Sequence, residues 1–285
     1  MAKTNKVISF ASFKGGAGRT VTLANVAFQL SKEFRVGCID FDVEAGSLHE
    51  MFEIVPEVGK KSIQHFFIEP ETYAEFYGEP YPDYTNKDIF IKELVIDVKD
   101  QTRGKWIEDE TQKGNLFLIK AEPDAQLNSL FFTGASMFDG FSDIIAYYGE
   151  YLNLDYILID CRSGISGMSL PGLSYSDVTV VFMRWARQHR YGTQRFFEWY
   201  TAYLEKACIE TKILLVATGV GKNNVDKISG FSENELKGKP IDNIVIPEID
   251  KLVDCETVFG SAAQESDQSY YVELADALKE IKKRE

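Results

Sequence analysis

The residues with the clearest chemistry lie near the start of the chain, in the stretch "SFASFKGGAGRT" at residues 9–20. Its three glycines let a backbone approach phosphate oxygens closely with the N–H groups turned inward. Thr20 adds a hydroxyl suited to Mg²⁺. A phosphate loop normally has lysine immediately before that hydroxyl residue, but here the residue is Arg19 and the lysine, Lys14, precedes the glycines. The stretch predicts a phosphate site of unusual composition.

Three further polar features follow apolar runs. "CIDFDVEAGSLH" carries Asp40 and Asp42, whose i, i+2 spacing sends both carboxylates to one side of an extended chain. "YILIDCRSG" carries Asp160, which is suited to holding Mg²⁺ through a water, and "IVIPEIDKLVDC" ends in a proline-containing turn. Because open α/β sheets bind ligands at the carboxyl ends of their strands, these features favour a nucleotide site over a simple glycine turn.

The elements that must position these residues are visible as short apolar runs. They read "KVISFAS", "RVGCIDFD", "NLFLIKAE", "YILIDCRS", "VTVVFMR", "KILLVAT" and "NIVIPEI". Most are continuous, as is typical of strands covered on both faces. Stretches with helical spacing, such as "TVTLANVAFQLSKEF", separate several of them. We therefore predict an α/β fold, with a mostly parallel twisted sheet of about seven strands and helices on both faces.

Composition limits the classes of function. The net charge is −13, which opposes sequence-independent binding to nucleic acid. Cys38, Cys161, Cys208 and Cys255 have no metal-binding spacing, so we interpret them as reduced core or near-core thiols of a cytoplasmic protein. No segment approaches the roughly 20 apolar residues of a membrane span, and no membrane association is expected.

Residues 56–115 interrupt the alternation of strands and helices. Within them, residues 69–84 hold five carboxylates, five aromatic residues, three prolines and no basic residue. Two interpretations stay open. The segment is either a solvated insertion with a few aromatic side chains packed against the core, or a surface that binds a partner. No linker is visible, so we expect one domain over residues 1–285 with this acidic aromatic insertion.

Together these motifs resemble the deviant Walker A ATPases of the ParA/MinD group. That family's loop reads K-G-G-x-G-K-[ST], and residues 14–20, "KGGAGRT", match it except at Arg19. "IDFD", "LDYILID" and "IPEID" are similar to the family's second motif, Walker B strand and adenine-side turn. The resemblance covers residues 5–52 and 115–285. The arginine loop with "FDVEAGSLH" and "IDCRSGIS" resembles more closely a bacterial branch whose loops read K-G-G-V-G-R-[ST]. Members of that branch resemble components of multi-gene defence or conflict systems, so the resemblance implies such a role.

The resemblance implies a P-loop NTPase fold, ATP and Mg²⁺ as cofactors, and a role for each matching residue. Lys14 would reach the phosphates of the other subunit in a nucleotide-sandwich homodimer, and Asp42 would position the attacking water. Thr20 would bind Mg²⁺ directly and Asp160 through water, with Asp40 close to the metal. The full set implied at the nucleotide is Gly15, Gly16, Ala17, Gly18, Arg19, Thr20, Val21, Thr218, Pro247 and Asp250, the last three on the base and ribose side.

Arginine at position 19 keeps the positive charge that the β- and γ-phosphates require. It is longer than lysine and planar, and it binds oxygens as a fork. We therefore expect ATP binding to persist and Arg19 to join the catalytic group. We expect hydrolysis to be slow without a partner, because phosphoryl transfer depends on positioning.

Two other segments bear on partners. "RWARQHRYGTQR" at residues 184–195 carries four arginines and one histidine. It is an exposed helix start, a surface for the dimer mate or a protein partner, or, against the overall charge, a nucleic-acid contact. The C-terminal "YYVELADALKEIKKRE" places acidic residues among its apolar ones, which favours a helix packed on the core over a membrane helix.

The leading functional hypothesis is a switch, in which ATP joins two subunits and the dimer recruits an unidentified protein partner. One rival is a small-molecule ligase on the same scaffold, of the dethiobiotin-synthetase type. The other is a largely non-hydrolysing nucleotide-bound scaffold in a larger complex. The signature lysine favours the switch, and the aromatic insertion favours the scaffold.

Overall fold

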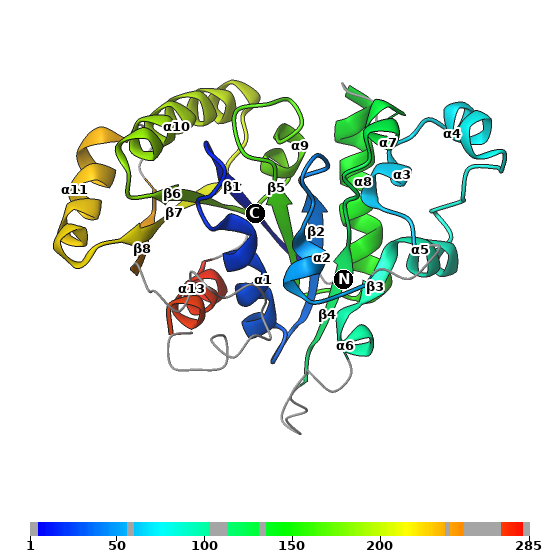
Figure 1. The fold of residues 1–285 in the computed structure, drawn as a ribbon, viewed down its shortest axis with the longest axis horizontal. Coiled ribbons are helices and arrows are strands. Elements are labelled where there is room, and N and C mark those ends of the chain that lie inside the picture. Colours follow the sequence, from blue (N-terminus) through cyan, green and yellow to red (C-terminus); the bar gives the residue numbers. More distant parts are fainter. Residues whose placement is uncertain are drawn as a thin grey trace.

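A single sheet organises the chain. The computed structural model describes residues 5–55, 60–102, 113–130, 135–236, 240–247 and 269–281. In this part of the chain the eight strands lie in the order β3-β4-β2-β5-β1-β6-β7-β8 (Figure 1). Their bounds are β1 Lys6–Ser12, β2 Arg35–Phe41, β3 Val95–Asp97, β4 Asn115–Ile119, β5 Tyr156–Cys161, β6 Val178–Arg184, β7 Lys212–Val220 and β8 Asp242–Pro247.

The seven predicted strands are all present and pair in parallel, which confirms the predicted fold class. The eighth strand, β3, was not predicted. It spans three residues at the edge of the sheet and runs antiparallel to β4. A strand this short offers too little alternation to be recognised in a sequence.

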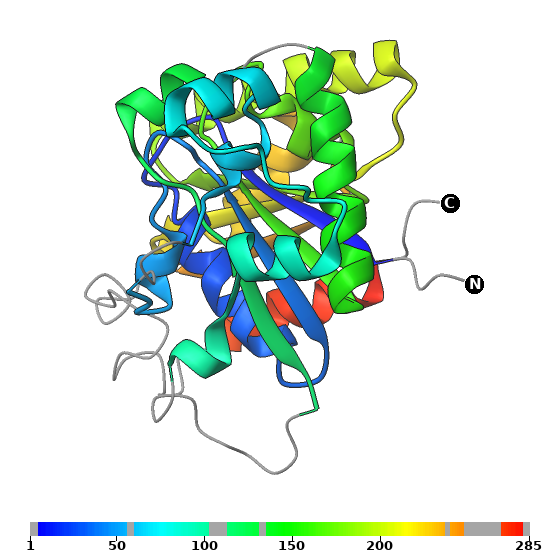
Figure 2. The ribbon, with the colours of Figure 1, turned by 90° about the vertical axis from the view of Figure 1, so that its right-hand side faces the viewer.

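Helices cover both faces of the sheet (Figures 1 and 2). Their bounds are α1 Arg19–Leu30, α2 Leu48–Met51, α3 Ile63–Phe66, α4 Pro70–Tyr77, α5 Lys87–Leu94, α6 Val98–Gln101, α7 Ala125–Leu130, α8 Ala135–Leu152, α9 Leu170–Ser174, α10 Arg187–Ala207, α11 Asp226–Glu235 and α13 Ser269–Glu280. One face carries α1, α2, α6 and α13, whose apolar side chains share one core cluster. The other carries α3, α5 and α8 to α11, which share a second cluster.

The strands read as continuous apolar runs because both faces of the sheet are buried. In β1, Val7 and Ala11 belong to one cluster, and Ile8 and Phe10 belong to the other. All seven residues of this strand are buried. Burying two faces of a strand removes alternation from its sequence, as expected for a parallel sheet.

The insertion predicted at residues 56–115 contains α3 to α6 and β3, and its aromatic side chains pack inward. Of the five aromatics in residues 69–84, Tyr73 and Tyr84 are buried, and Phe76 is 46% exposed. Farther along the chain, Phe90 of α5 is buried and meets the rings of Tyr147 and Tyr151 on α8. Among the described residues of the insertion, more aromatic side chains therefore pack inward than lie exposed on the surface.

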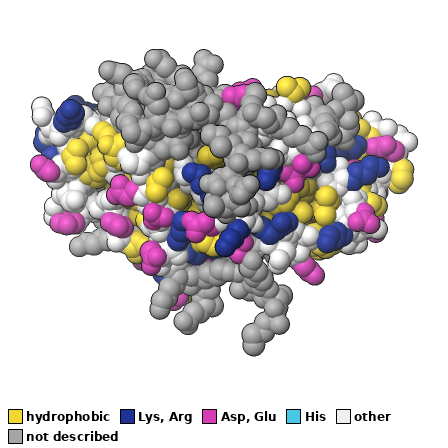
Figure 3. Space-filling model, turned by 90° about the horizontal axis from the view of Figure 1, so that it is seen from below, with side chains coloured by type: hydrophobic (Ala, Val, Ile, Leu, Met, Phe, Trp, Pro, Cys, Tyr) yellow, Lys and Arg dark blue, Asp and Glu magenta, His cyan; other side chains and the backbone are white. Residues whose placement is uncertain are grey.

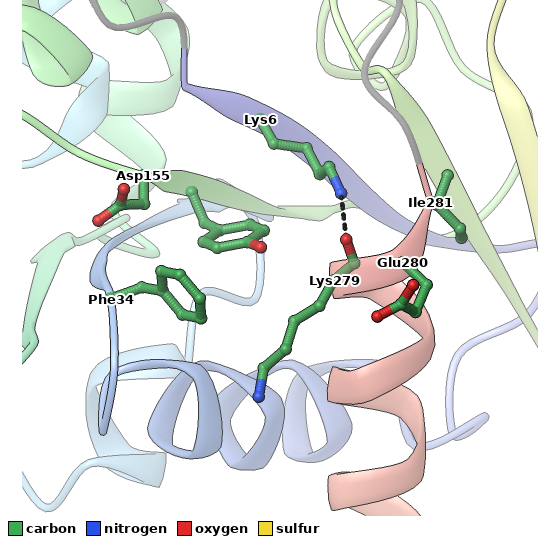
Figure 4. Close-up of a pocket in the computed structure, with 7 residues that line it drawn as sticks. Lys6, Phe34, Asp155, Lys279, Glu280 and Ile281 are labelled. Carbon is green, nitrogen blue, oxygen red and sulfur yellow. Dashed lines mark hydrogen bonds between the residues drawn. The ribbon is translucent and has the colours of Figure 1, made fainter.

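The C-terminal helix α13 packs against α1, as predicted for a core helix. Lys6 contacts its last turn, where its Nζ donates to the Leu278 carbonyl at 2.7 Å. The same Nζ donates to the Lys279 carbonyl at 3.4 Å (Figure 4). The Lys279 ammonium in turn meets Glu33 at 2.9 Å. Lys6 thus satisfies two of the last carbonyls of the helix, and both cations complement the helix dipole at its C-terminus. The adjoining cavity of about 310 Å³ lies at the amino ends of β1 and β5, at the opposite edge from the glycine loop.

Cysteine placement follows the prediction at two positions. Cys38 and Cys161 are buried in β2 and β5, and burial raises the pKa of each thiol above its usual range. Cys208 is exposed, so the prediction of a core or near-core thiol is wrong there. It caps α10 in a left-handed conformation with φ of 54°. Cys255 lies outside the described residues.

The surface carries mixed charge. On the face seen in Figure 3, basic and acidic side chains of the described residues alternate over short distances. Among the described helices, none is long and apolar enough to cross a bilayer.

Candidate nucleotide site

The glycine loop connects β1 to α1 at the carboxyl edge of the sheet. Gly16 and Gly18 adopt φ values of 73° and 80°, a left-handed conformation that favours glycine. Gly18 caps α1, which has no side-chain cap and no acidic residue in its first turn. The N–H groups of that first turn therefore remain available to an anion, and the helix dipole favours one there.

Neighbouring strands hold the loop in shape. The Thr218 hydroxyl at the end of β7 donates to the Ala17 carbonyl at 2.9 Å, and its methyl group would lie 3.7 Å from a Cβ at position 18. The Ser12 hydroxyl donates to the Lys14 carbonyl at 2.9 Å. The Gly164 N–H donates to the Ser12 carbonyl at 2.8 Å. The loop is thus fixed by β1, β7 and the segment after β5.

Arg19 lies at the centre of the site. Its guanidinium donates from Nε to Asp160 Oδ1 at 3.0 Å and from Nη2 to Asp42 Oδ2 at 3.2 Å. Its Nη1 donates to the Ser12 hydroxyl at 3.3 Å. The arginine is 8% exposed. Burial opposes its charge, but the charges of Asp160 and Asp42 outweigh that effect and raise the pKa of Arg19. One fork therefore joins the two predicted acidic motifs to the loop.

Asp160 and Asp40 lie side by side because β2 and β5 pair them in register. Both are buried, at 1% and 0% exposed. Burial raises the pKa of Asp40 well above its usual range, and the charge of Asp160 adds to the effect. Burial also raises the pKa of Asp160, although Arg19 and Thr20 oppose the rise. Two adjacent buried carboxylates favour additional positive charge at this position.

The two carboxylates differ in what they offer a metal ion. Asp160 accepts from the Thr20 hydroxyl at 2.6 Å, so these two groups converge beside the loop. Asp40 accepts backbone N–H groups on both oxygens, from Asp42 at 3.2 Å and Leu48 at 3.0 Å. Hydroxyl and carboxylate oxygens are the ligands that Mg²⁺ prefers, so Thr20 and Asp160 fit this ion. The contacts of Asp40 shape the loop that carries Asp42.

Lys14 lies outside this cluster. Its Nζ donates to Gln188 Oε1 at 3.1 Å, in the first turn of α10. The same helix approaches the loop at Gly192, where an added Cβ would lie 2.2 Å from the Phe13 ring. The two cations of the loop therefore have different surroundings. Arg19 is buried among carboxylates, and Lys14 is half-buried beside the basic start of α10.

The remaining predicted residues are placed as follows. Gly15, Gly16 and Gly18 are exposed, Ala17 is buried, and Val21 is half-buried in the first turn of α1. Pro247 ends β8 next to β7, the strand of Thr218. Asp250 lies outside the described residues. The structure thus brings together Arg19, Thr20, Asp42 and Asp160 with the glycines. Thr218 contacts the loop through its hydrogen bond to the Ala17 carbonyl.

Sequence reasoning missed two polar residues of this region. Ser12 contacts both Arg19 and the Lys14 carbonyl, and Gln188 contacts the Lys14 ammonium. Ser12 is the last residue of β1, so its position directly before the loop was a usable signal. Gln188 is 174 residues from Lys14, and nothing in the spacing indicated the contact.

The basic segment at residues 184–195 forms the end of β6 and the start of α10. Two of its arginines lie over aromatic rings, Arg190 over Trp185 at 4.5 Å and Arg195 over Tyr191 at 5.5 Å. Tyr191 is 61% exposed. Part of this charge is therefore engaged within the segment, on an accessible surface next to Lys14.

Comparisons with known proteins give a family and a fold for the chain. The profile of the CobQ/CobB/MinD/ParA nucleotide binding domain matches residues 8–257. The "Putative replication protein A" of Rhizobium rhizogenes is 30% identical over 184 residues, which is 62% of this chain and 39% of that protein. The chain thus spans well under half the length of this curated relative.

Solved structures share the fold. The septum site-determining protein MinD of Pyrococcus horikoshii, complexed with Mg-ADP, superposes with a TM-score of 0.66 and 15% identity, over 97% of each chain. A chain of the MinC:MinD cell division protein complex of Aquifex aeolicus gives a TM-score of 0.64 and 19% identity, over 96% of each chain. The α/β fold predicted from the sequence is that of the MinD and ParA P-loop NTPases.

Proposed function

Because the chain belongs to the CobQ/CobB/MinD/ParA family of nucleotide-binding ATPases, we propose that it is a Mg²⁺-dependent ATPase that acts as a nucleotide-dependent dimerisation switch. One observation carries the proposal. Arg19, Thr20, Asp42 and Asp160 converge beside a glycine loop that opens a helix. This convergence combines an anion site, a cation and carboxylates of the kind that phosphoryl transfer requires.

ATP would bind with its β- and γ-phosphates against the loop of residues 15–20 and the N-terminus of α1. Thr20 and Asp160 would hold Mg²⁺, which neutralises charge on the phosphates and orients them when bound. The Pyrococcus MinD structure contains Mg-ADP, which supports this pair of ligands at the family level. Thr218, Pro247 and Asp250 would lie on the base and ribose side, and the adjacent carboxyl ends of β7 and β8 support this assignment for the first two.

Arg19 gives the site its own kinetic character. Its guanidinium is paired with Asp42, the carboxylate proposed to position the attacking water. Binding the phosphates would require the guanidinium to exchange carboxylate oxygens for phosphate oxygens. Until that exchange is complete, one oxygen of Asp42 is occupied by the guanidinium and is not available to a water. We therefore propose slow hydrolysis that a partner accelerates.

The dimer would form through the nucleotide face, with Lys14 reaching the phosphates of the second copy. The position of Lys14 outside the Arg19 cluster, beside the exposed start of α10, supports this assignment. In the MinC:MinD complex a related ATPase binds a protein partner, which supports recruitment of a protein by the dimer. The net charge of −13 weighs against nucleic acid as the ligand.

The domain organisation belongs to the same proposal. We treat residues 1–285 as one ATPase domain with an acidic aromatic insertion at about 56–115. The packing of Phe90 on α8 supports an insertion that shares the core of the domain. We also propose a role in a bacterial multi-gene defence system, and the resemblance of the glycine loop is what supports it.

The proposal is tested by nucleotide binding to the full chain. ATP affinity, measured by equilibrium dialysis with and without Mg²⁺, is expected to fall at least about tenfold in Arg19→Ala, because a charge-assisted contact is lost. Arg35→Ala is the matched control. Arg35 also donates from Nε, to the Leu152 carbonyl at 2.7 Å, but at the amino end of β2. Equal affinity in wild type and Arg19→Ala contradicts the assignment.

A further inference from the structure

The loop that carries Asp42 is held from behind by two amides. Val43, the residue after Asp42, is 3% exposed. Its carbonyl oxygen accepts from Asn128 Nδ2 at 2.9 Å and from Gln64 Nε2 at 3.5 Å. Asn128 belongs to α7, and Gln64 belongs to α3, the first helix of the insertion. The contact therefore links the proposed catalytic loop to the insertion.

Gln64 is fully buried and uses both ends of its side chain. Its Nε2 donates to the Glu122 carbonyl and, at 3.1 Å, to Asn128 Oδ1. Its Oε1 accepts from the Glu122 N–H at 3.2 Å. Because a buried amide without partners costs free energy, a fully satisfied one fixes its surroundings in a single arrangement. Gln64 thus fixes the segment after β4 and the Val43 carbonyl relative to each other.

Close packing reinforces the same junction. The Ile63 N–H donates to the Lys120 carbonyl at 2.8 Å, so α3 is anchored to the end of β4. At Gly46, in the Asp42 loop, an added Cβ would lie 2.7 Å from the Ala121 Cβ. The loop, the segment after β4 and the start of the insertion therefore form one packed unit. In front of that unit, Arg19 holds the Asp42 carboxylate.

We propose that Gln64 and Asn128 are positioning residues for Asp42, and that they couple the insertion to the nucleotide site. The proposal rests on the proposed function, because it concerns the carboxylate assigned to the attacking water. When phosphate oxygens replace Asp42 as the partner of the Arg19 guanidinium, the Asp42 carboxylate is released. The side-chain amides of Gln64 and Asn128, which donate to the Val43 carbonyl, then determine where this carboxylate lies. Coupling of this kind is reciprocal, so a ligand on the insertion changes the Asp42 loop and nucleotide changes the insertion.

The test compares Gln64→Leu and Asn128→Ala with Asn86→Ala in the full chain. Asn86 is the matched control. It also accepts backbone N–H groups in the insertion, from Asp88 and Ile89, but it caps α5. Without nucleotide, amide hydrogen exchange at residues 42–48 is expected to rise about tenfold in both test variants and to stay unchanged in the control. Single-turnover hydrolysis is expected to fall about tenfold in the test variants, with ATP affinity within about twofold of wild type.

The outcomes separate this proposal from the function on which it rests. Unchanged exchange at residues 42–48 in both test variants overturns the positioning role, with or without ATPase activity. Matched losses of ATP affinity and turnover also overturn it, because they indicate general damage to the site. A wild type that neither binds nor hydrolyses ATP ends the proposed function, and the exchange comparison still decides the positioning role. If Gln64→Leu fails to fold, the half-buried Asn128 still provides the comparison.

Discussion

Replacing Arg19 by lysine restores the residue that the family's loop usually carries and isolates what the fork does. In the structure three different nitrogens of Arg19 reach Asp160, Asp42 and Ser12. Lysine offers one ammonium group, which acts as a point charge and cannot reproduce this planar set of contacts. We expect the ammonium to stay with the buried Asp160 and to release Asp42.

The magnitude follows from the contact that is lost. A hydrogen bond to a charged group contributes about 1.5–3 kcal/mol, so the free energy of unfolding of Arg19→Lys should fall by about that amount. If the same contact must break before Asp42 positions water, its loss lowers the barrier to hydrolysis by a similar amount. That corresponds to about a ten- to hundredfold faster single turnover.

The assay is single-turnover phosphate release at saturating ATP and Mg²⁺, with urea unfolding of the same samples. Arg35→Lys is the control, since Arg35 lies at the amino end of β2, away from the glycine loop, and its substitution should leave hydrolysis unchanged. An Arg19→Lys variant that hydrolyses ATP no faster than wild type, or more slowly, refutes the reasoning. It would mean that the arginine stabilises the transition state more than it restrains Asp42.

Three further predictions concern the supports of the site and the insertion. Thr218→Val keeps the shape of the side chain but removes the hydroxyl that donates to the Ala17 carbonyl. ATP affinity, measured by equilibrium dialysis, should fall about fivefold to tenfold. An unchanged affinity argues against a role for this hydrogen bond. Gly192→Ala places a Cβ 2.2 Å from the Phe13 ring, so the free energy of unfolding in urea should fall by about 1–3 kcal/mol. Gly230→Ala in α11 meets nothing within 4 Å and should be neutral or stabilising. Equal effects of the two substitutions would contradict close packing at Gly192. Burial lowers the pKa of His65 to about 4, below its usual value of 6.5. The stability that the neutral imidazole contributes is therefore present above pH 6.5 and is lost as the pH falls toward 4. The free energy of unfolding should be lower by about 2 kcal/mol at pH 5. His65→Gln should remove that part of the pH dependence, and an identical pH profile in the variant contradicts it.

Much of the fold could be predicted because the sheet is buried on both faces. That burial forces continuous apolar runs, and the seven parallel strands were recognisable for this reason. The interior of the insertion could not be predicted, because its aromatic residues are fixed by partners far along the chain. Phe90 packs on Tyr147 and Tyr151, and Tyr81 donates to the Phe66 carbonyl. Nothing in local spacing indicates such pairs.

The site divides in the same way. Spacing placed Thr20, Asp42 and Asp160 at one edge of the sheet, because the motifs follow strands that end at that edge. Spacing could not show that Arg19 bridges the two carboxylates, or that both oxygens of Asp40 are taken by backbone N–H groups. The contacts of Asp40 and Asp42 depend on the path of the loop after β2, where the Val43 carbonyl accepts from Gln64 and Asn128 at distant positions in the sequence.

The most direct test of the switch is the solution mass of wild type and Asp42→Ala with ATP, with ADP and without nucleotide. Light scattering at each condition reports the oligomeric state. We expect twice the monomer mass with ATP only, and a longer-lived dimer in Asp42→Ala because this variant should hydrolyse ATP more slowly. A mass that is the same under all three conditions in both proteins would contradict the switch, and would favour a ligase or a constitutive scaffold on this fold.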